Sequence, residues 1–300
     1  MERAENLARM LSVTESFAAG NDDEGAWISV LDTFYDHDAF EQTGRRLSGL
    51  NVARWYFIDC DNPNSLISSL NMARENARAL RHLIPVMSWK QINMLYSRVS
   101  ELKARKITLP RLDALCEEVR LECLAYQGGV DRTWYRDEVW LFFWLGCELE
   151  RADQTTRLLD VKYYQLASAG SDDDNLVAPP DIVWWNCLLR SASVFHAFRR
   201  RHDLNAGPVE AARFLLFDED CPQSVRLSAI GAADRLRELE CDYGAAPSAD
   251  LRAASEQLLE LLSPEKVVKP GKDLHSYLDN VQRQIISFNE ALGERYFDLD

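Results

Sequence analysis

The sequence predicts an all-α protein, a helical bundle built from two tandem pseudo-symmetric repeats. Three observations lead to this prediction. Apolar residues recur at helical spacing over much of the chain, no stretch alternates convincingly enough to make a strand, and motifs of the first half return in the second half in the same order. With 300 residues and 47% hydrophobic content, the chain can bury a substantial core.

The duplication is clearest in one fourteen-residue motif. Residues 53–66 are ARWYFIDCDNPNSL and residues 212–225 are ARFLLFDEDCPQSV, with six identities where about one is expected from average residue usage. Residues 2–6 are echoed in the same way by residues 150–154. We expect a single domain over residues 1–300, with repeat one at about 1–129 and repeat two at about 130–300. The second copy gains residues mainly between Gly170 and Trp185, which predicts an enlarged surface loop there.

The predicted helices follow one another along the chain. The first contains the Glu-Arg pair near the N-terminus, and a long central helix carries Trp140, Trp144 and Cys147 at helical spacing. This central helix is apolar over more than half its girth at its N-terminal end, which is typical of a helix inside a bundle. Further helices are predicted at about 25–36, 64–83, 88–104, 110–126, 181–201, 208–217, 222–239, 249–262 and 272–296.

Two of these helices should begin at the Asp-x-Asp-x-Pro-x-Ser turns of the duplicated motif. Asp61 and Asp220 lie where an N-cap carboxylate can accept first-turn amides. Pro63 and Pro222 then fall in the first turn, where a missing N–H costs nothing.

Composition excludes several classes of partner. The formal net charge of −14 argues against a nucleic-acid backbone or an anionic membrane. The longest apolar run, residues 139–147, is shorter than the roughly 18 residues of a spanning helix, and the charged N-terminus lacks a signal peptide's apolar stretch. We therefore expect a cytoplasmic protein. Its seven cysteines show no Cys-x-x-Cys spacing and are expected to be reduced thiols, several of them in the core.

The candidate functional residues lie mainly on the two Glu-Arg helices. The second copy places Glu150, Asp153, Gln154 and Arg157 on one polar face, and the first copy places Glu2, Glu5, Asn6 and Arg9 in the same way. Arg3 and Arg151 point about 100° away from their glutamates. If a pseudo-twofold axis relates the repeats, the two stripes should face each other across a shared centre.

Two interpretations of this cluster stay open. A polar stripe inside a bundle is usually a paired ion network that fixes register. The alternative is an anion or carboxylate site, because arginine forks suit such groups. A second candidate is the run Arg74, Glu75, Asn76, Ala77 and Arg78, whose counterpart in copy two, residues 233–237, lacks the first arginine and the asparagine. Its plain interpretation is an exposed helix with alternating charges.

Known catalytic and metal-binding signatures are absent from the sequence. There is no Gly-x-Gly-x-x-Gly, Walker-type loop, Gly-x-Ser-x-Gly or His-Glu-x-x-His, and the five histidines lack ligand spacing to one another or to a cysteine. We therefore assign no catalytic residue, metal ligand or cofactor. Whether the chain is an enzyme stays open, and an enzyme that acts alone is the weaker interpretation.

Several segments together resemble a known family. ERAENLARML, NPNSLISSLNMARENARAL, LGCELERADQTTRLLDVKYY, FLLFDEDCPQSVRLS and LHSYLDNVQRQI look like the bacterial alpha-E family, an all-helical domain named for its Glu-Arg motif. The resemblance covers essentially the whole chain. It places the family's Glu-Arg motif on Glu2-Arg3 and Glu150-Arg151, and its Ala-Arg-Glu-Asn-Ala-Arg motif on residues 73–78.

The resemblance also implies partners. Members of the family are associated, by gene neighbourhood and sometimes by fusion, with a circularly permuted ATP-grasp ligase and a transglutaminase-like peptidase. It implies a role in forming or modifying peptide-type amide bonds. Members usually carry one to two helical turns ahead of Glu-Arg, whereas Met1 directly precedes Glu2 here. We therefore expect a truncated first helix or a late start codon, with Glu2 and Arg3 on a frayed end.

The function that follows is that of a non-catalytic or co-catalytic partner of an ATP-grasp type ligase in peptide or amide-bond biosynthesis. One alternative is an enzyme of that pathway that binds a carboxylate substrate at the Glu/Arg cluster. Another is a small-metabolite binding module. A deep pocket over Arg151 and Arg157 would favour the enzyme or the binding module, whereas fully paired arginines would favour the partner.

Overall fold

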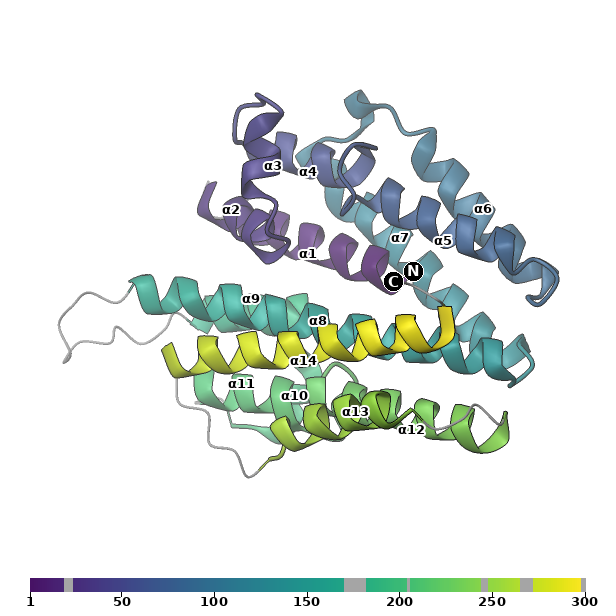
Figure 1. The fold of residues 1–300 in the computed structure, drawn as a ribbon. Coiled ribbons are helices and arrows are strands. Elements are labelled where there is room, and N and C mark those ends of the chain that lie inside the picture. The colour runs from purple at the N-terminus through teal and green to yellow at the C-terminus, as the bar shows by residue number, and fades with distance from the viewer. Residues whose placement is uncertain (19–23, 170–181, 204–205, 244–247, 265–271, 298–300) are drawn as a thin grey trace. The chain divides into compact units, whose positions relative to one another are not determined.

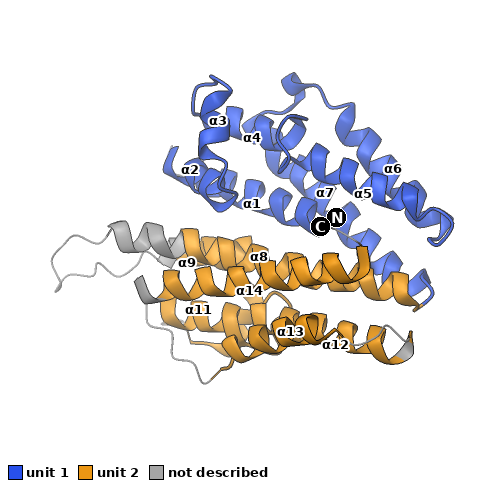
Figure 2. Cartoon of the chain, in the orientation of Figure 1, with its two compact units in different colours: residues 1–135 blue, residues 136–300 orange. Residues whose placement is uncertain are grey.

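The computed structural model describes residues 1–18, 24–169, 182–203, 206–243, 248–264 and 272–297. Within these ranges the chain is helical, and none of the residues described there forms a strand, so the predicted all-α class is confirmed. Contacts divide the chain into two compact units, residues 1–135 and 136–300, which Figure 2 draws in different colours.

Unit 1 contains seven α-helices and one short 3₁₀ helix among its described residues (Figure 1). They are α1 (Glu2–Ala18), α2 (Glu24–Thr33), α3 (His37–Gln42), α4 (Gly49–Ile58), α5 (Leu66–Ala79), α6 (Val86–Ser100), η1 (Ala104–Lys106) and α7 (Leu109–Thr133). The helices α1 and α7 pack along each other, and α5 and α6 form an antiparallel hairpin.

Unit 2 contains seven α-helices among its described residues. They are α8 (Glu138–Ala169), α9 (Ile182–Ser191), α10 (Phe195–Arg201), α11 (Pro208–Phe217), α12 (Val225–Asp242), α13 (Ala249–Leu261) and α14 (Lys272–Phe297). The long helix α8 packs against α12 and α14. None of the described helices is both long enough and apolar enough to cross a membrane.

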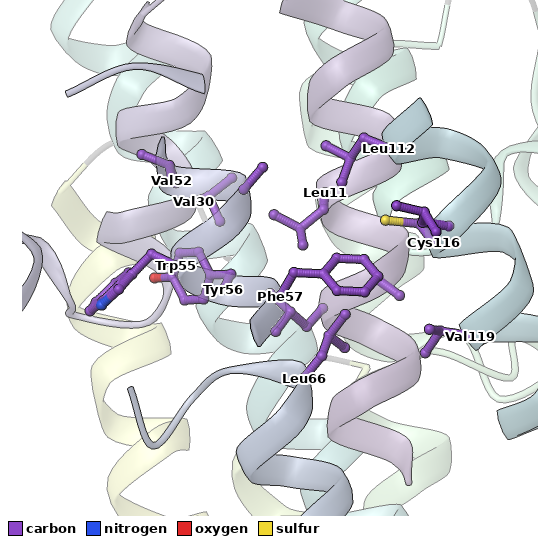
Figure 3. Close-up of a cluster of buried hydrophobic side chains, with 14 of the residues drawn as sticks. Leu11, Val30, Val52, Trp55, Tyr56, Phe57, Leu66, Leu112, Cys116 and Val119 are labelled. Carbon is purple, nitrogen blue, oxygen red and sulfur yellow. The ribbon is translucent and has the colours of Figure 1, made fainter. Parts of the chain in front are cut away.

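The core of unit 1 forms where α1, α2, α4, α5 and α7 meet. Figure 3 shows side chains from these helices converging on one another, and the residues labelled there are Leu11, Val30, Val52, Trp55, Tyr56, Phe57, Leu66, Leu112, Cys116 and Val119. Tyr56 is fully buried, and its hydroxyl donates to Asp36 Oδ2 at 3.0 Å. Burying a large apolar side chain contributes about 1.5–3 kcal/mol, so this cluster holds the five helices together.

The helices that follow the two turns of the duplicated motif are capped by other residues than predicted. The N-cap residues are Ser65 and Ser224, whose hydroxyls accept the amides of residues 68 and 227. Asp59 and Asp218 accept the amides of residues 61 and 220 at 3.1 and 2.9 Å. Pro63 and Pro222 therefore precede the helix, and Asp61 and Asp220 are not its caps. A serine hydroxyl next to the first turn reaches its amides more directly than a carboxylate four residues earlier.

Most predicted helices are found within a few residues of their expected bounds, and two regions differ. The helix expected at 181–201 is two helices, because Ser193 adopts a left-handed conformation with φ 57° between α9 and α10. The helices α3 and α4 were missed, although α4 contains the first ARWYF motif. The enlarged loop expected between Gly170 and Trp185 lies mostly outside the described residues.

The seven cysteines are free thiols, as expected. Cys116, Cys123, Cys147, Cys187 and Cys221 are buried, and Cys60 and Cys241 are exposed. Burial raises the pKa of the Cys123 thiol to about 12, which keeps it protonated and unreactive.

Candidate functional site

The polar face of α1 is buried in unit 1 and is internally paired. Arg9 is 5% exposed, and its Nη1 donates to Glu5 Oε2 at 2.6 Å while its Nη2 donates to Asn6 Oδ1 at 2.7 Å. On α7, Arg120 Nε donates to the other oxygen of Glu5 at 3.3 Å. Both oxygens of the Glu5 carboxylate thus accept from guanidinium groups, and the network joins α1 to α7.

The electrostatics of this network follow from its burial. Desolvation lowers the pKa of Arg9 below its ordinary value. The nearby Glu5 and Glu2 carboxylates act in the opposite direction and offset part of this effect. A guanidinium in such a place stays charged only because carboxylates compensate it. The Arg9 guanidinium is therefore bound by side chains of the protein and is shielded from solvent.

Glu2 belongs to the same buried layer. It is 8% exposed, and Gln127 of α7 donates to its Oε2 at 2.5 Å. The expectation of a frayed end is wrong for Glu2, because α1 begins at this residue and a second helix binds its carboxylate. Arg3 lies next to it on α1 and is partly exposed.

In unit 2 the corresponding residues pair mainly along α8. Arg157 Nε donates to Asp153 Oδ2 at 2.7 Å, and Gln154 donates to Glu150 Oε1. Arg151 points off this stripe, as expected, and its Nη1 donates to Glu148 Oε2 at 3.0 Å. Glu148 was not expected from the sequence, because it precedes the Glu-Arg pair and lies outside the polar stripe.

Glu148 also explains a close helix contact. A Cβ atom added at Gly231 of α12 would lie 3.1 Å from the carboxyl carbon of Glu148, closer than most real Cβ contacts. The absence of a side chain at Gly231 therefore lets α12 approach α8 beside the Glu148–Arg151 pair. The two polar stripes lie in different units, and the expectation that they face each other across a shared centre stays a prediction.

The second candidate run lies on the α5–α6 hairpin. Arg74 Nε donates to Asn93 Oδ1 of α6 at 2.8 Å, and its guanidinium lies 5.1 Å from the centre of the Tyr96 ring. Arg74 thus ties the two helices together, and its Nη1 donates to Glu75 at 3.1 Å. Glu75 also pairs with Arg78 at 2.5 Å. Asn76 and Arg78 are exposed, Arg74 and Glu75 are half-buried and Ala77 is buried, so the run is only partly open to solvent.

A further cluster of titratable side chains was not expected from the sequence. His275 Nδ1 of α14 lies 2.7 Å from Asp160 Oδ1 of α8, and its Nε2 lies 3.8 Å from Asp279 Oδ2. The ligand atoms of the three residues lie within 4.8 Å of one another. Asp160 and His275 are 115 residues apart, so no local spacing could reveal the cluster.

The chemistry available at the Glu-Arg residues is limited by their pairing. Arg9, Arg120, Arg151 and Arg157 each donate to a carboxylate of the same unit. The Arg120–Glu5 pair joins α7 to α1, and the other three pairs lie within one helix. An anion site needs guanidinium groups that still have donors to offer.

Comparison with models of protein families finds a match for this chain. The matching model is Alpha-E, described as a predicted alpha-helical domain with a conserved ER motif, and it spans residues 1–297. No curated protein and no solved structure matches the chain. Glu-Arg pairs occur at residues 2–3, 150–151 and 294–295 of the chain. Because the match covers nearly the whole chain, the protein belongs to the Alpha-E family.

Proposed function

We propose that this chain is a non-catalytic or co-catalytic partner of an ATP-grasp type ligase in the formation or modification of peptide-type amide bonds. The observation that carries the proposal is that the Glu-Arg residues are paired within each unit and are buried in unit 1. The family's signature residues then maintain the fold, and the contribution to function comes from a surface. The transglutaminase-like peptidase would act in the same pathway, in the cytoplasm.

The surface best suited to a partner is the α5–α6 hairpin, residues 66–100. Large apolar side chains are exposed along it, with Met87 at 70% and Met94 at 61%. Met72, Leu80, Leu83 and Val86 are exposed beside them. Methionine is common at binding surfaces because its unbranched side chain adapts to the partner. Several large apolar side chains exposed on one hairpin favour a protein partner over solvent.

Charge specifies which kind of partner surface fits. Residues 66–100 carry five basic and one acidic side chain, a net charge of +4 in a chain whose net charge is −14. Residues 225–261, which include α12 and α13, carry four basic and seven acidic side chains, a net charge of −3. The occupant of the hairpin is therefore an acidic face of the ligase, because opposite potentials steer association and fix orientation.

The two units are best explained as copies of one ancestral repeat. Both contain seven described α-helices in the same order, and the second to seventh helices begin 158–163 residues apart. The equivalent turns are capped by Ser65 and Ser224. Tyr35 and Ser193, at φ 56° and 57°, occupy the same place between the second and third helices. In this proposal, copy one diverged at its fifth and sixth helices to bind the ligase.

The test is complex formation with an ATP-grasp ligase from the same organism, measured with both purified proteins. Arg78→Glu should weaken the complex by about tenfold, because it places a negative charge against an acidic face. Raising the salt concentration should weaken the wild-type complex as well. Product formation by the ligase should fall in parallel.

The matched control is Arg237→Glu on α12. Arg78 and Arg237 are 68% and 66% exposed, and each pairs with an acid three residues earlier. Arg237→Glu should leave the affinity unchanged. The absence of a complex, or equal weakening by both variants, would refute the proposal. Loss of product in Arg151→Ala with unchanged melting and unchanged complex formation would favour the enzyme alternative instead.

A further inference from the structure

An open cavity of about 490 Å³ lies in unit 1 between α4 and the loop that contains η1. It is lined by Arg45, Asn51, Arg54, Ile58, Asp59, Cys60 and Ala104. Its volume lies within the range of small-molecule sites, about 300–1,000 Å³. None of the Glu-Arg residues lines it, so it is separate from the network that the family motif forms.

Arg54 is held in place with donors to spare. Its Nε donates to the carbonyl of Ile107 at 3.2 Å, which orients the guanidinium. Within the described ranges, neither of its Nη atoms donates to a protein acceptor. Two parallel N–H groups at the edge of a guanidinium match the two oxygens of a carboxylate or phosphate.

The only carboxylate that lines the cavity is already engaged. Asp59 Oδ2 accepts from Arg45 Nη2 at 2.6 Å, and its Oδ1 accepts the amide of Asp61 at 3.1 Å. Asp59 therefore orients Arg45 at the wall and does not neutralise Arg54. The cavity keeps an uncompensated positive charge.

Among the flanking residues four basic side chains outnumber one exposed acid, Asp61. Arg46, Lys103, Arg105 and Lys106 are exposed neighbours of the lining residues, and they make no ion pair with any residue that the structure describes. Such a concentration of unpaired cations is unusual in a chain with a net charge of −14. Mutual repulsion of these groups is relieved when an anion enters.

We propose that this cavity binds a small metabolite through an oxyanion group, a carboxylate or phosphate, held by the Nη atoms of Arg54. Arg45 and Asn51 also line the cavity, and the Asn51 side-chain amide donates to the carbonyl of Arg46 at 2.9 Å. The basic residues 103, 105 and 106 attract the ligand. This site is additional to the proposed docking of a ligase and does not depend on it.

Unit 2 supplies a natural comparison. Arg213, the counterpart of Arg54 in the duplicated motif, donates from Nη2 to the carbonyl of Pro264 at 3.5 Å. Glu219 replaces Cys60 in that copy, and Arg226 donates to it at 2.6 Å. An acid thus stands where copy one has a neutral thiol, and the anion site is specific to unit 1.

Ligand binding in the cavity can be measured through Cys60, because its exposed thiol lines the cavity. The rate of alkylation by N-ethylmaleimide is followed for each cysteine by peptide mass spectrometry, with sodium citrate, sodium phosphate or sodium chloride at equal ionic strength. Citrate or phosphate should slow alkylation of Cys60 by about threefold at twice its Kd. The rate at Cys241, the exposed thiol of unit 2, should not change. Protection by one salt only identifies the oxyanion as carboxylate or as phosphate.

Two variants then locate the binding group. Arg54→Gln should abolish protection, whereas Arg213→Gln should retain it. If Arg54→Gln unfolds unit 1, the buried thiols Cys116 and Cys123 become reactive. The Arg45→Gln variant is then used in its place, and it should also lose the protection of Cys60. The proposal is overturned if neither citrate nor phosphate protects Cys60 in the wild-type protein. It is also overturned if protection survives in a folded Arg54→Gln variant or in the Arg45→Gln variant that replaces it.

Discussion

At the scale of single residues, the Glu-Arg network illustrates why burial decides the value of an ion pair. The Arg9 and Glu5 side chains are each 6% exposed, whereas Arg157 and Asp153 are 28% and 19% exposed. A charge pair in the interior has lost most of its hydration, so removing one partner leaves the other with neither water nor a counter-ion. The pair in unit 2 keeps partial solvation and is screened.

Glu5→Gln should therefore destabilise the protein by about 3–5 kcal/mol, because it leaves the buried Arg9 uncompensated on that side. The measurement is chemical denaturation followed by circular dichroism. A second change, Arg9→Met, should recover part of the loss in the Glu5→Gln background, because it removes the orphaned charge.

The control for this prediction is Glu117→Gln on α7. Glu117 accepts from Arg120 of the same network, but its side chain is 51% exposed. Its loss should cost no more than about 1 kcal/mol. Equal costs for Glu5→Gln and Glu117→Gln would mean that burial does not govern the network.

At the scale of the helix, α14 is attached to α8 by the contact between His275 and Asp160. The hydrogen bond that His275 donates to Asp160 raises the pKa of His275 above its ordinary value, and the carboxylate's charge acts in the same direction. Burial raises the pKa of Asp160 as well. The folded protein thus holds both protons more tightly than the unfolded chain does.

The contribution of His275 should therefore depend on pH. It is fully present below the ordinary histidine pKa of about 6.5 and is lost as pH rises through the raised folded value. We expect His275→Gln to lower Tm more at about pH 6 than at about pH 8. The comparison requires melts of both proteins across that range.

An Asp160→Asn background provides the control, because it removes the acceptor that raises the His275 pKa. In that background the effect of His275→Gln should vary much less with pH. Identical Tm differences at both pH values in the original background would show that the contact does not couple protonation to the position of α14.

At the scale of the whole molecule, charge is distributed unevenly between the two units. Unit 1 has a net charge of −3 and unit 2 a net charge of −11, and the basic residues of unit 1 gather between residues 45 and 111. In the proposed duplication the two halves begin with the same charge pattern, and this difference arises by divergence. The hairpin and the cavity proposed as binding surfaces both lie in the divergent region.

The duplication predicts the result of an experimental structure determination. When unit 1 is superposed on unit 2, Asp61 should fall near Asp220 and Pro63 near Pro222, with α1–α7 following α8–α14 in order. The measurement is a crystal or cryo-electron microscopy structure of the full chain. Halves with unrelated helix paths would contradict the repeat.

The sequence by itself determined the helical class, most helix positions and the family. Those properties depend on the spacing of apolar residues and on local motifs, which are present in any short window of the chain. It also placed Arg157 with Asp153 and Arg9 with Glu5, because residues four apart on a helix are neighbours.

Only the tertiary structure decided what these residues do. The pairing of Glu2 with Gln127, of Arg120 with Glu5 and of His275 with Asp160 joins helices more than 100 residues apart in sequence. The serine caps and the break at Ser193 likewise depend on backbone geometry that residue types do not specify uniquely. Burial is a property of the packed chain, and burial separates the paired Arg9 of the core from the Arg54 that faces an open cavity.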